Sequence, residues 1–169
     1  MTGIPANTYW AVAGRVLAGP HPEFVEGGLP RLLDVGVRRF VDLTARGESY
    51  ESDLRELDPG ARYVNRPIDD LGVPSEDEMR EILRELRPAG GEVVYVHCRY
   101  GLGRTGTAVG CLLVEEGTPA TDALRRLREL RSGCADADLA SPETREQCEF
   151  IERWSQRPNG PGGDQPVSS

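Results

Sequence analysis

Short apolar segments with alternating side chains occur through the first hundred residues and predict the strands of a sheet. Residues 38–43 and 62–65 carry β-branched and aromatic side chains and are followed by polar or turn-forming residues, as strands are. Looser alternation over residues 8–18 predicts one or two more short strands. Residues 92–97 form an almost continuous apolar run, which is typical of a strand buried on both faces.

Segments with helical periodicity separate these strands. Short helices are predicted at residues 29–35, with Pro30 near the start and Gly36 after the end, and at residues 52–57. Ser75 and Glu78 form a capping box that opens a third helix. That helix buries one apolar face, made of Met79, Ile82, Leu83 and Leu86.

Three helices are predicted after residue 97, with no strand between them. A strongly apolar helix covers about residues 105–116, a second follows Thr118-Pro119, and a third opens at Ser141-Pro142. The second and third helices each bury one stripe, formed by Ala123, Leu124, Leu127 and Leu130 and by Phe150, Ile151 and Trp154. Since strands alternate with helices early and helices cluster late, the pattern predicts an α/β fold. We expect a central, mostly parallel sheet flanked by helices, with strand 92–97 in the middle.

The length of 169 residues predicts a single domain, over residues 1–155, with a sizeable core. Pro, Gly and Ser dominate from there on, so residues 156–169 are predicted to be a disordered tail. The chain has no long apolar run and no basic-then-apolar N-terminal segment, so we expect no membrane span and a cytoplasmic location. The net charge of −8 argues against nucleic acid and membranes as partners, and we expect a monomer.

The cysteines stand at positions 98, 111, 134 and 148 without a C-x-x-C pair. This spacing argues against a zinc site or a disulfide framework. We therefore expect the chain to work without a metal or other cofactor.

The segment His97–Gly106 carries the candidate chemistry. It places the Cys98 thiol at the end of an apolar strand and the Arg104 guanidinium six residues later, on a glycine-bearing turn that leads into a helix. Such a turn directs backbone N–H groups inward and the helix adds its positive end, so the segment predicts a cradle for a dianion. Chance would produce this combination in a chain of this composition with an expectation on the order of 10⁻⁵, which makes coincidence a poor explanation.

These residue types suit the cleavage of phosphate esters through a cysteine. Cys98 would attack phosphorus as a thiolate, the form that a helix N-terminus and a nearby arginine favour. Arg104 would hold two phosphate oxygens in its planar fork, and Thr105 would donate its hydroxyl to the sulfur. The remaining residues of the phosphate-binding loop are Arg99, Tyr100, Gly101, Leu102 and Gly103.

A leaving oxygen needs a proton from a general acid, which we expect on a separate loop. The segment Pro67–Pro74 qualifies because it follows a strand, is stiffened by proline at both ends and carries Asp69 and Asp70. The same carboxylate would activate the water that hydrolyses the phospho-cysteine, so this two-step reaction needs no metal.

The motif and the acid-bearing loop together resemble those of the cysteine-dependent protein tyrosine phosphatase superfamily, in its compact dual-specificity-like branch. His97–Gly106 matches the family signature HC-x5-R-[ST]-G at every defining position, and the similarity extends over about residues 8–154. The resemblance implies a tyrosine-phosphatase-like single domain. It also implies that Asp70 rather than Asp69 is the acid, that His97 orients the cysteine backbone, and that Gln147 approaches the catalytic loop from the last helix.

The substrate implied by the resemblance is a phosphorylated protein or a small phosphate ester. Phosphotyrosine is expected, phosphoserine and phosphothreonine stay open, and phosphoinositides are the alternative. A binding-only pseudophosphatase is a further alternative. Gly101–Gly106 also matches the G-x-G-x-x-G dinucleotide fingerprint, but in that fold the helix returns to a second parallel strand, whereas here Gly117 leads to another helix.

Overall fold

The computed structural model describes residues 3–45 and 49–154, so the predicted tail, 156–169, lies outside the described residues. The elements in chain order are β1 (Tyr9–Val12), β2 (Val16–Gly19), the 3-10 helix η1 (Pro22–Phe24), α1 (Gly28–Val35), β3 (Val37–Asp42), α2 (Glu51–Leu57), β4 (Arg62–Asn65), α3 (Glu76–Leu86), β5 (Val93–His97), α4 (Gly103–Glu115), α5 (Ala120–Leu130) and α6 (Arg145–Trp154).

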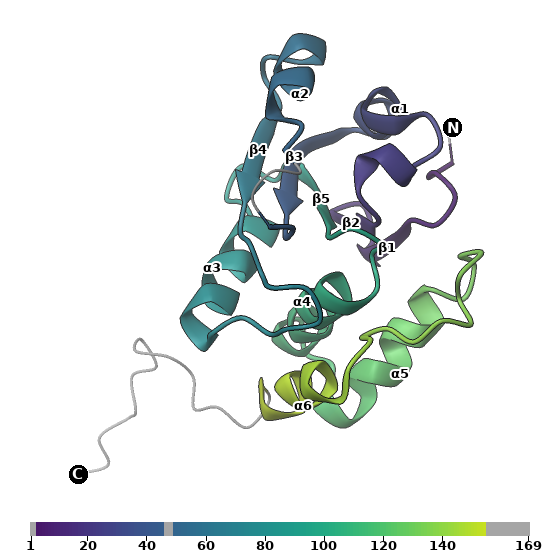
Figure 1. The fold of residues 1–169 in the computed structure, drawn as a ribbon, viewed down its shortest axis with the longest axis vertical. Coiled ribbons are helices and arrows are strands. Elements are labelled where there is room, and N and C mark those ends of the chain that lie inside the picture. The colour runs from purple at the N-terminus through teal and green to yellow at the C-terminus, as the bar shows by residue number, and fades with distance from the viewer. Residues whose placement is uncertain (1–2, 46–48, 155–169) are drawn as a thin grey trace.

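The strands form one five-stranded sheet in the order β1-β2-β5-β3-β4. β1 pairs with β2 in antiparallel fashion, whereas β2, β5, β3 and β4 run parallel to one another. β5 is therefore the central strand, as its apolar run predicted. The α/β class, with helices flanking a mostly parallel sheet, is confirmed (Figure 1).

The parallel register brings the carboxyl ends of the strands to one edge of the sheet. Asp42, which ends β3, pairs with both Asn65 at the end of β4 and His97 at the end of β5. β5 continues into the loop Cys98–Arg104, and β4 continues into Pro67–Pro74. The two loops singled out in the sequence therefore emerge at the same edge of the sheet, one strand apart, where open α/β sheets bind their ligands.

Alternate side chains of the sheet pack into two separate cores. On β5, Val94 and Val96 belong to the core shared with α3 to α6, whereas Val93 and Tyr95 pack into the core shared with α1 and α2. Figure 1 shows α1 and α2 above the strands and α3 to α6 below them. Because both faces of β5 are covered, both sets of side chains are apolar, which explains the continuous apolar run.

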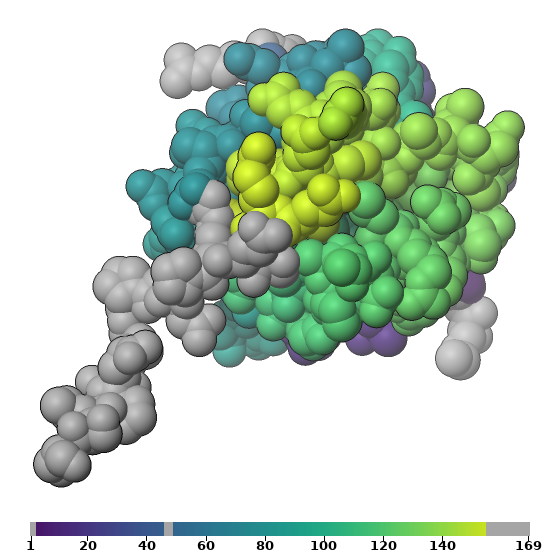
Figure 2. Space-filling model, turned by 90° about the horizontal axis from the view of Figure 1, so that it is seen from below, coloured from purple at the N-terminus to yellow at the C-terminus, as the bar shows by residue number. Residues whose placement is uncertain are grey.

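α4 is buried along nearly its whole length between the sheet, α5 and α6. Two glycines allow α6 and the segment before it to approach so closely. A Cβ at Gly106 would collide with Ser141 Oγ, and one at Gly110 would collide with Ile151 Cδ1. Figure 2 shows the outer side of this layer, where α6 lies between α3 and α5.

The capping box of α3 is confirmed, since Ser75 Oγ accepts from Glu78 N at 3.1 Å and Glu78 Oε2 accepts from Ser75 N at 2.7 Å. α5 begins at Ala120, directly after Thr118-Pro119 as predicted, with Pro119 as its N-cap and no side-chain cap.

Two helix boundaries differ from the prediction. α4 begins at Gly103 rather than at residue 105, so the phosphate-binding motif runs into its first turn. α6 begins at Arg145 rather than at Ser141, because Ser141 Oγ donates to the Leu102 carbonyl at 2.7 Å and holds this segment against the start of α4. None of the described helices is long and apolar enough to cross a membrane.

Candidate active site

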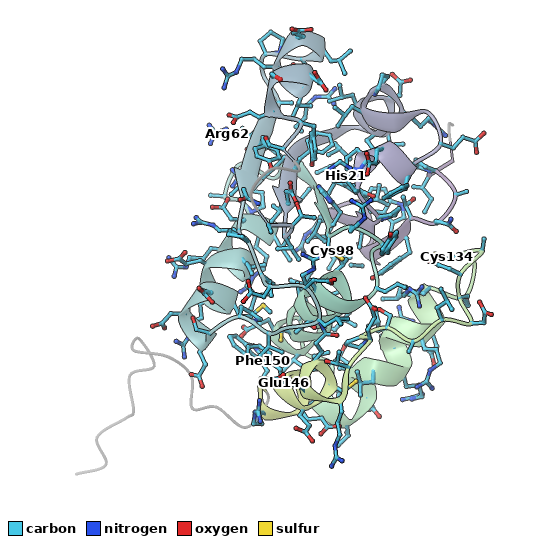
Figure 3. The ribbon with its side chains drawn as sticks, in the orientation of Figure 1. His21, Arg62, Cys98, Cys134, Glu146 and Phe150 are labelled. Carbon is cyan, nitrogen blue, oxygen red and sulfur yellow. The ribbon has the colours of Figure 1, made fainter. Side chains whose placement is uncertain are left out.

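The loop Cys98–Arg104 joins the end of β5 to the first turn of α4. Cys98 is 3% exposed and lies at the centre of the molecule, between the sheet and the helices below it (Figure 3). Arg104 is the second residue of α4 and is also buried, with 7% of its side chain exposed. The strand-turn-helix arrangement thus places a buried thiol and a buried guanidinium on one loop, as their spacing predicted.

The backbone carbonyls and the backbone N–H groups of this loop differ in their hydrogen bonding. Three carbonyls are bound to neighbouring groups, namely Cys98 O to His97 Nδ1 (2.9 Å), Arg99 O to His21 N (2.9 Å), and Leu102 O to Gly106 N (3.1 Å) and Ser141 Oγ (2.7 Å). Within residues 3–45 and 49–154, the N–H groups of residues 100–103 donate no hydrogen bond. A turn with bound carbonyls and unpaired N–H groups is suited to an anion.

Gly101 is the point at which this turn needs a glycine. Its φ is +75°, a left-handed conformation that side chains disfavour. A Cβ there would lie 2.6 Å from the carbonyl carbon of Gly19 and 2.7 Å from its oxygen. The Tyr95 hydroxyl donates to the Pro20 carbonyl at 2.5 Å and holds this end of β2 in place. The loop is therefore packed against backbone that cannot easily move.

His97 is fully buried, and its partners determine its protonation. Burial lowers the pKa of His97 to about 4, so the ring is uncharged at neutral pH and its 4.0 Å separation from Asp42 Oδ1 is not an ion pair. Nδ1 faces the Cys98 carbonyl, which can only accept, so Nδ1 carries the proton. The Tyr50 hydroxyl then donates to Nε2 at 2.6 Å. This geometry supports the orienting role that the resemblance implied.

A polar network continues from His97 to the ends of β3 and β4. Asp42 is fully buried and accepts from Thr44 N at 2.8 Å, from Thr44 Oγ1 at 2.6 Å and from the Tyr63 hydroxyl at 2.6 Å. Neither Tyr50 nor Asp42 is among the site residues predicted from the sequence. Tyr50 lies 47 residues from His97 along the chain, so no local spacing could have revealed their contact.

Arg104 also contacts the loop Pro67–Pro74. Its Nη1 donates to the Ile68 carbonyl at 3.2 Å, and its Nη2 lies 3.5 Å from Asp70 Oδ1. The Asp70 side chain is 75% exposed, so this ion pair contributes little to stability. Its significance is geometric, because it places a carboxylate beside the anion-binding guanidinium.

The two aspartates of this loop lie in a tight turn. Gly72 N donates to the Asp69 carbonyl at 2.8 Å, and Leu71 has a φ of 62°, which is uncommon for a residue with a side chain. Asp70 is the aspartate whose carboxylate approaches Arg104. The geometry therefore favours Asp70 over Asp69, the choice made from the register of the loop.

The hydrogen bonding of Thr105 and of Gln147 differs from the expectation. Thr105 Oγ1 is buried and has no hydrogen-bond partner in the described part of the chain, so the expected bond to Cys98 is not formed in this structure. Gln147 is fully buried and lies against Gly103, so it does approach the loop. Its Nε2 donates to the Gly72 carbonyl at 3.1 Å, a contact that the sequence did not suggest.

Arg99 and Tyr100 form an exposed rim together with Phe24 of η1. The rings of Phe24 and Tyr100 stack with their centroids 5.6 Å apart, and the Arg99 guanidinium lies 5.3 and 5.5 Å from them. Arg99 Nη1 also lies 3.8 Å from Glu23 Oε1. A recess of about 510 Å³ adjoins this rim, and its lining includes Arg99 but not Cys98. The rim is therefore a surface beside the anion cradle rather than part of its floor.

All four cysteines are free. Cys111 is fully buried in α4, and burial raises the pKa of its thiol well above the usual range, so this side chain is an unreactive part of the core. Among the described residues, no three His, Cys, Asp or Glu side chains are grouped so that they could hold a metal ion.

The fold and the loop around Cys98 and Arg104 define the class of cysteine-dependent phosphatase domains. Residues 5–150 match the family described as "PTP-SAK: Swiss Army Knife protein, DSP-PTPase phosphatase domain". The chain belongs to this family of compact, dual-specificity-like tyrosine phosphatase domains.

Individual relatives agree with this assignment. The chain is 33% identical over 110 residues to "Putative tyrosine phosphatase 067L" of Invertebrate iridescent virus 3, covering 60% of this chain and 43% of that protein. It is 31% identical over 134 residues to "Dual specificity protein phosphatase CDC14AB" of Danio rerio, covering 73% of this chain and 22% of that protein. The chain thus spans less than half the length of these two relatives.

Solved structures share the fold. The crystal structure of Tk-PTP in the active form superposes with a TM-score of 0.72 at 31% identity, covering 89% of this chain and 97% of that one. The crystal structure of PTPMT1 superposes with a TM-score of 0.69 at 21% identity, covering 88% of this chain and 94% of that one. The second likeness shows the fold alone.

Proposed function

We propose that this protein hydrolyses phosphate monoesters through a phospho-cysteine intermediate. The loop Cys98–Arg104 carries the proposal, because it combines a buried thiol, backbone N–H groups without acceptors and a buried guanidinium. The family to which the chain belongs supports the same chemistry.

In the first step, Cys98 Sγ attacks phosphorus, an S–P bond forms and the P–O ester bond breaks. Asp70 gives its proton to the leaving oxygen, which would otherwise depart as an unstable anion. Arg104 and the loop N–H groups hold the three other oxygens, whose charge is spread over them in the transition state.

In the second step, a water molecule attacks phosphorus and the S–P bond breaks. The Asp70 carboxylate takes the proton of this water, and inorganic phosphate leaves. The sulfur departs as a thiolate. Thr105 would donate to it, because its buried hydroxyl has no other partner in the described chain.

We infer that the substrate is a phosphorylated protein, with phosphotyrosine expected and phosphoserine and phosphothreonine open. The support is that relatives above 30% identity are named as tyrosine or dual-specificity phosphatases. Arg99 is engaged by Glu23 and two aromatic rings, and the chain carries a net charge of −8. Both facts argue against a multiply phosphorylated lipid on an anionic membrane.

Turnover of para-nitrophenyl phosphate tests the activity. Cys98→Ser should abolish it, by at least about 10⁴-fold, whereas Cys111→Ser in the buried part of α4 should leave the rate within about 2-fold. Vanadate should inhibit and a chelator should not. Binding of a phosphotyrosine peptide by the wild-type protein without turnover would instead identify a pseudophosphatase.

A side-by-side rate measurement decides the substrate class. Phosphotyrosine, phosphothreonine and phosphoserine peptides and phosphoinositide vesicles are compared at equal phosphate concentration. A higher kcat/KM on the vesicles than on any of the peptides would overturn the protein-substrate inference. The monomeric state and the cytoplasmic location stay predictions, tested by gel filtration and by cell fractionation.

A further inference from the structure

Gln147 is a fully buried side chain that bonds to the loop carrying Asp70. Its Oε1 accepts from the N–H groups of Glu143 at 3.0 Å and Thr144 at 3.1 Å, and its Nε2 donates to the Gly72 carbonyl at 3.1 Å. Backbone N–H groups can only donate and a carbonyl can only accept, so these partners fix the orientation of the amide.

The bond to Gly72 anchors the downstream end of the turn that carries Asp70. The N–H group of Gly72 donates to the Asp69 carbonyl at 2.8 Å, and its own carbonyl accepts from Gln147. Both polar backbone groups of Gly72 are therefore engaged, one within the turn and the other outside it. The outside partner comes from α6, 75 residues further along the chain.

The upstream end of the turn is anchored separately, through Ile68. Its N–H group donates to the Leu43 carbonyl at 3.0 Å, and its carbonyl accepts from Arg104 at 3.2 Å. Between the two anchors, Leu71 is 52% exposed and holds its left-handed φ of 62°. Such a conformation persists only where the surroundings impose it. Releasing one anchor would therefore let the turn relax and move Asp70.

The two bonds to Gln147 Oε1 argue against a second role, in which this oxygen would accept a hydrogen bond from the attacking water. Both acceptor directions of Oε1 are filled by backbone N–H groups. The amide also lies against the first residue of α4, since a Cβ at Gly103 would be 3.0 Å from Nε2. The side chain thus contacts the phosphate-binding loop on one side and the acid-bearing loop on the other.

We propose that Gln147 is a positioning residue for the general acid: through Gly72 it sets where Asp70 stands relative to the phosphate-binding loop. The proposal rests on the function proposed above, in which Asp70 protonates the leaving oxygen. A misplaced acid slows formation of the phospho-cysteine, and so lowers kcat/KM, only for those substrates whose leaving group needs the proton, whereas hydrolysis of the phospho-cysteine is the same step for every substrate. Dependence on the leaving group is therefore the signature that separates positioning of the acid from general support of the fold.

The test is Gln147→Glu, whose ionised carboxylate keeps an oxygen for the N–H groups of Glu143 and Thr144 but presents a second oxygen, without a hydrogen, to the Gly72 carbonyl. We expect kcat/KM on a phosphotyrosine peptide to fall about 10-fold, because small displacements of a catalytic group are costly. On para-nitrophenyl phosphate, whose leaving group is far more acidic, kcat/KM should stay within about 2-fold.

Thr144→Ala is the matched control, because Thr144 Oγ1 accepts from Gln147 N at 3.2 Å at the start of α6 and does not bond to the acid-bearing loop. It should affect both substrates equally. In the double variant Asp70→Asn, Gln147→Glu, the loss on phosphotyrosine should be no larger than in Asp70→Asn alone, because Gln147 acts through Asp70.

Equal losses on the two substrates, or additive losses in the double variant, would overturn the positioning role. If Asp70→Asn alone shows no dependence on the leaving group, the assignment of the acid fails and the positioning role fails with it. If Asp70→Asn shows that dependence and Gln147→Glu does not, the role of Gln147 alone fails. If Gln147→Glu does not fold, Gln147→Met replaces it, because methionine has a similar volume but cannot donate to the Gly72 carbonyl. The same two rates, on the phosphotyrosine peptide and on para-nitrophenyl phosphate, are then compared for this variant.

Discussion

The phosphate-binding loop, Cys98–Arg104, and the acid-bearing loop, Pro67–Pro74, meet at one edge of the sheet but are built in opposite ways. The Arg104 side chain is 7% exposed, whereas that of Asp70 is 75% exposed. Carbonyls of the first loop are bound to three neighbouring segments, and Gly101 is packed against backbone. The second loop is a turn on the surface, held at its two ends by side chains of Arg104 and Gln147.

The difference follows from what each loop has to do. Groups that stabilise developing charge are most effective when they are already in place, because any rearrangement during the reaction adds to the barrier. A general acid has to release a proton to the substrate and later take one from water, so it needs access to solvent and some freedom to move. A rigid buried loop and an anchored exposed loop satisfy these two demands.

Arg104→Lys tests the rigid side of the comparison and should have the largest effect. A lysine cannot hold two oxygens in one plane, so kcat/KM should fall by roughly 10² to 10³-fold. The loss should be similar on phosphotyrosine and on para-nitrophenyl phosphate, because the oxygens bound are the same in both. Arg99→Lys, on the exposed rim, should cost less than about 3-fold. A comparable loss of kcat/KM in both variants would show that the burial of Arg104 does not explain its contribution to catalysis.

Asp70→Asn tests the exposed side. It should lower kcat/KM on phosphotyrosine by about 10²-fold and on para-nitrophenyl phosphate by less, because para-nitrophenolate leaves with little help from an acid. Asp69→Asn, in the same turn, should leave both rates within about 2-fold. If Asp69→Asn instead caused the larger loss on phosphotyrosine, the assignment of Asp70 as the general acid would be wrong.

Gly101→Ala measures how tightly the phosphate-binding loop is packed. The added Cβ would need a left-handed φ and would lie 2.6 Å from the Gly19 carbonyl carbon, so we expect a loss of about 1–3 kcal/mol in the free energy of unfolding. Activity should fall about 10-fold as the N–H groups shift. Gly14→Ala shares the positive φ, at +69°, but its Cβ would meet nothing within 4 Å. It should cost about 1 kcal/mol and leave activity unchanged, which separates the close contact from the backbone conformation.

The last prediction concerns the buried His97 next to the rigid loop and affects stability rather than the rate of the reaction. Its pKa is lowered to about 4 in the folded protein, whereas an unfolded histidine takes up a proton near pH 6.5. Between these two pH values the unfolded chain binds more protons than the folded protein does. The contribution of His97 to the free energy of unfolding is therefore complete above pH 6.5, and it falls by up to about 1.4 kcal/mol per pH unit as the pH drops toward 4. Urea unfolding of the wild type and of His97→Asn from pH 4.5 to 7 measures this contribution as a difference in slope. Parallel slopes would contradict it.

Much of the fold could be predicted because the relevant signals are local. The apolar run at residues 92–97, the capping box at Ser75 and the apolar stripes of the helices each depend on residues within a few turns of one another. The start of α6 could not be predicted in this way. Ser141 resembles a helix-opening residue, yet its hydroxyl bonds to Leu102, 39 residues earlier, and the helix begins only at Arg145.

The amino-acid sequence by itself determined the chemistry of the phosphate-binding loop, because a thiol and a guanidinium six residues apart on a glycine turn can meet the same anion wherever the rest of the chain lies. Only the tertiary structure decided what surrounds them. Tyr50 reaches His97 across 47 residues, and Gln147 reaches Gly72 across 75. Such contacts depend on how strands and helices pack, and packing is set by the whole core rather than by any short stretch of sequence.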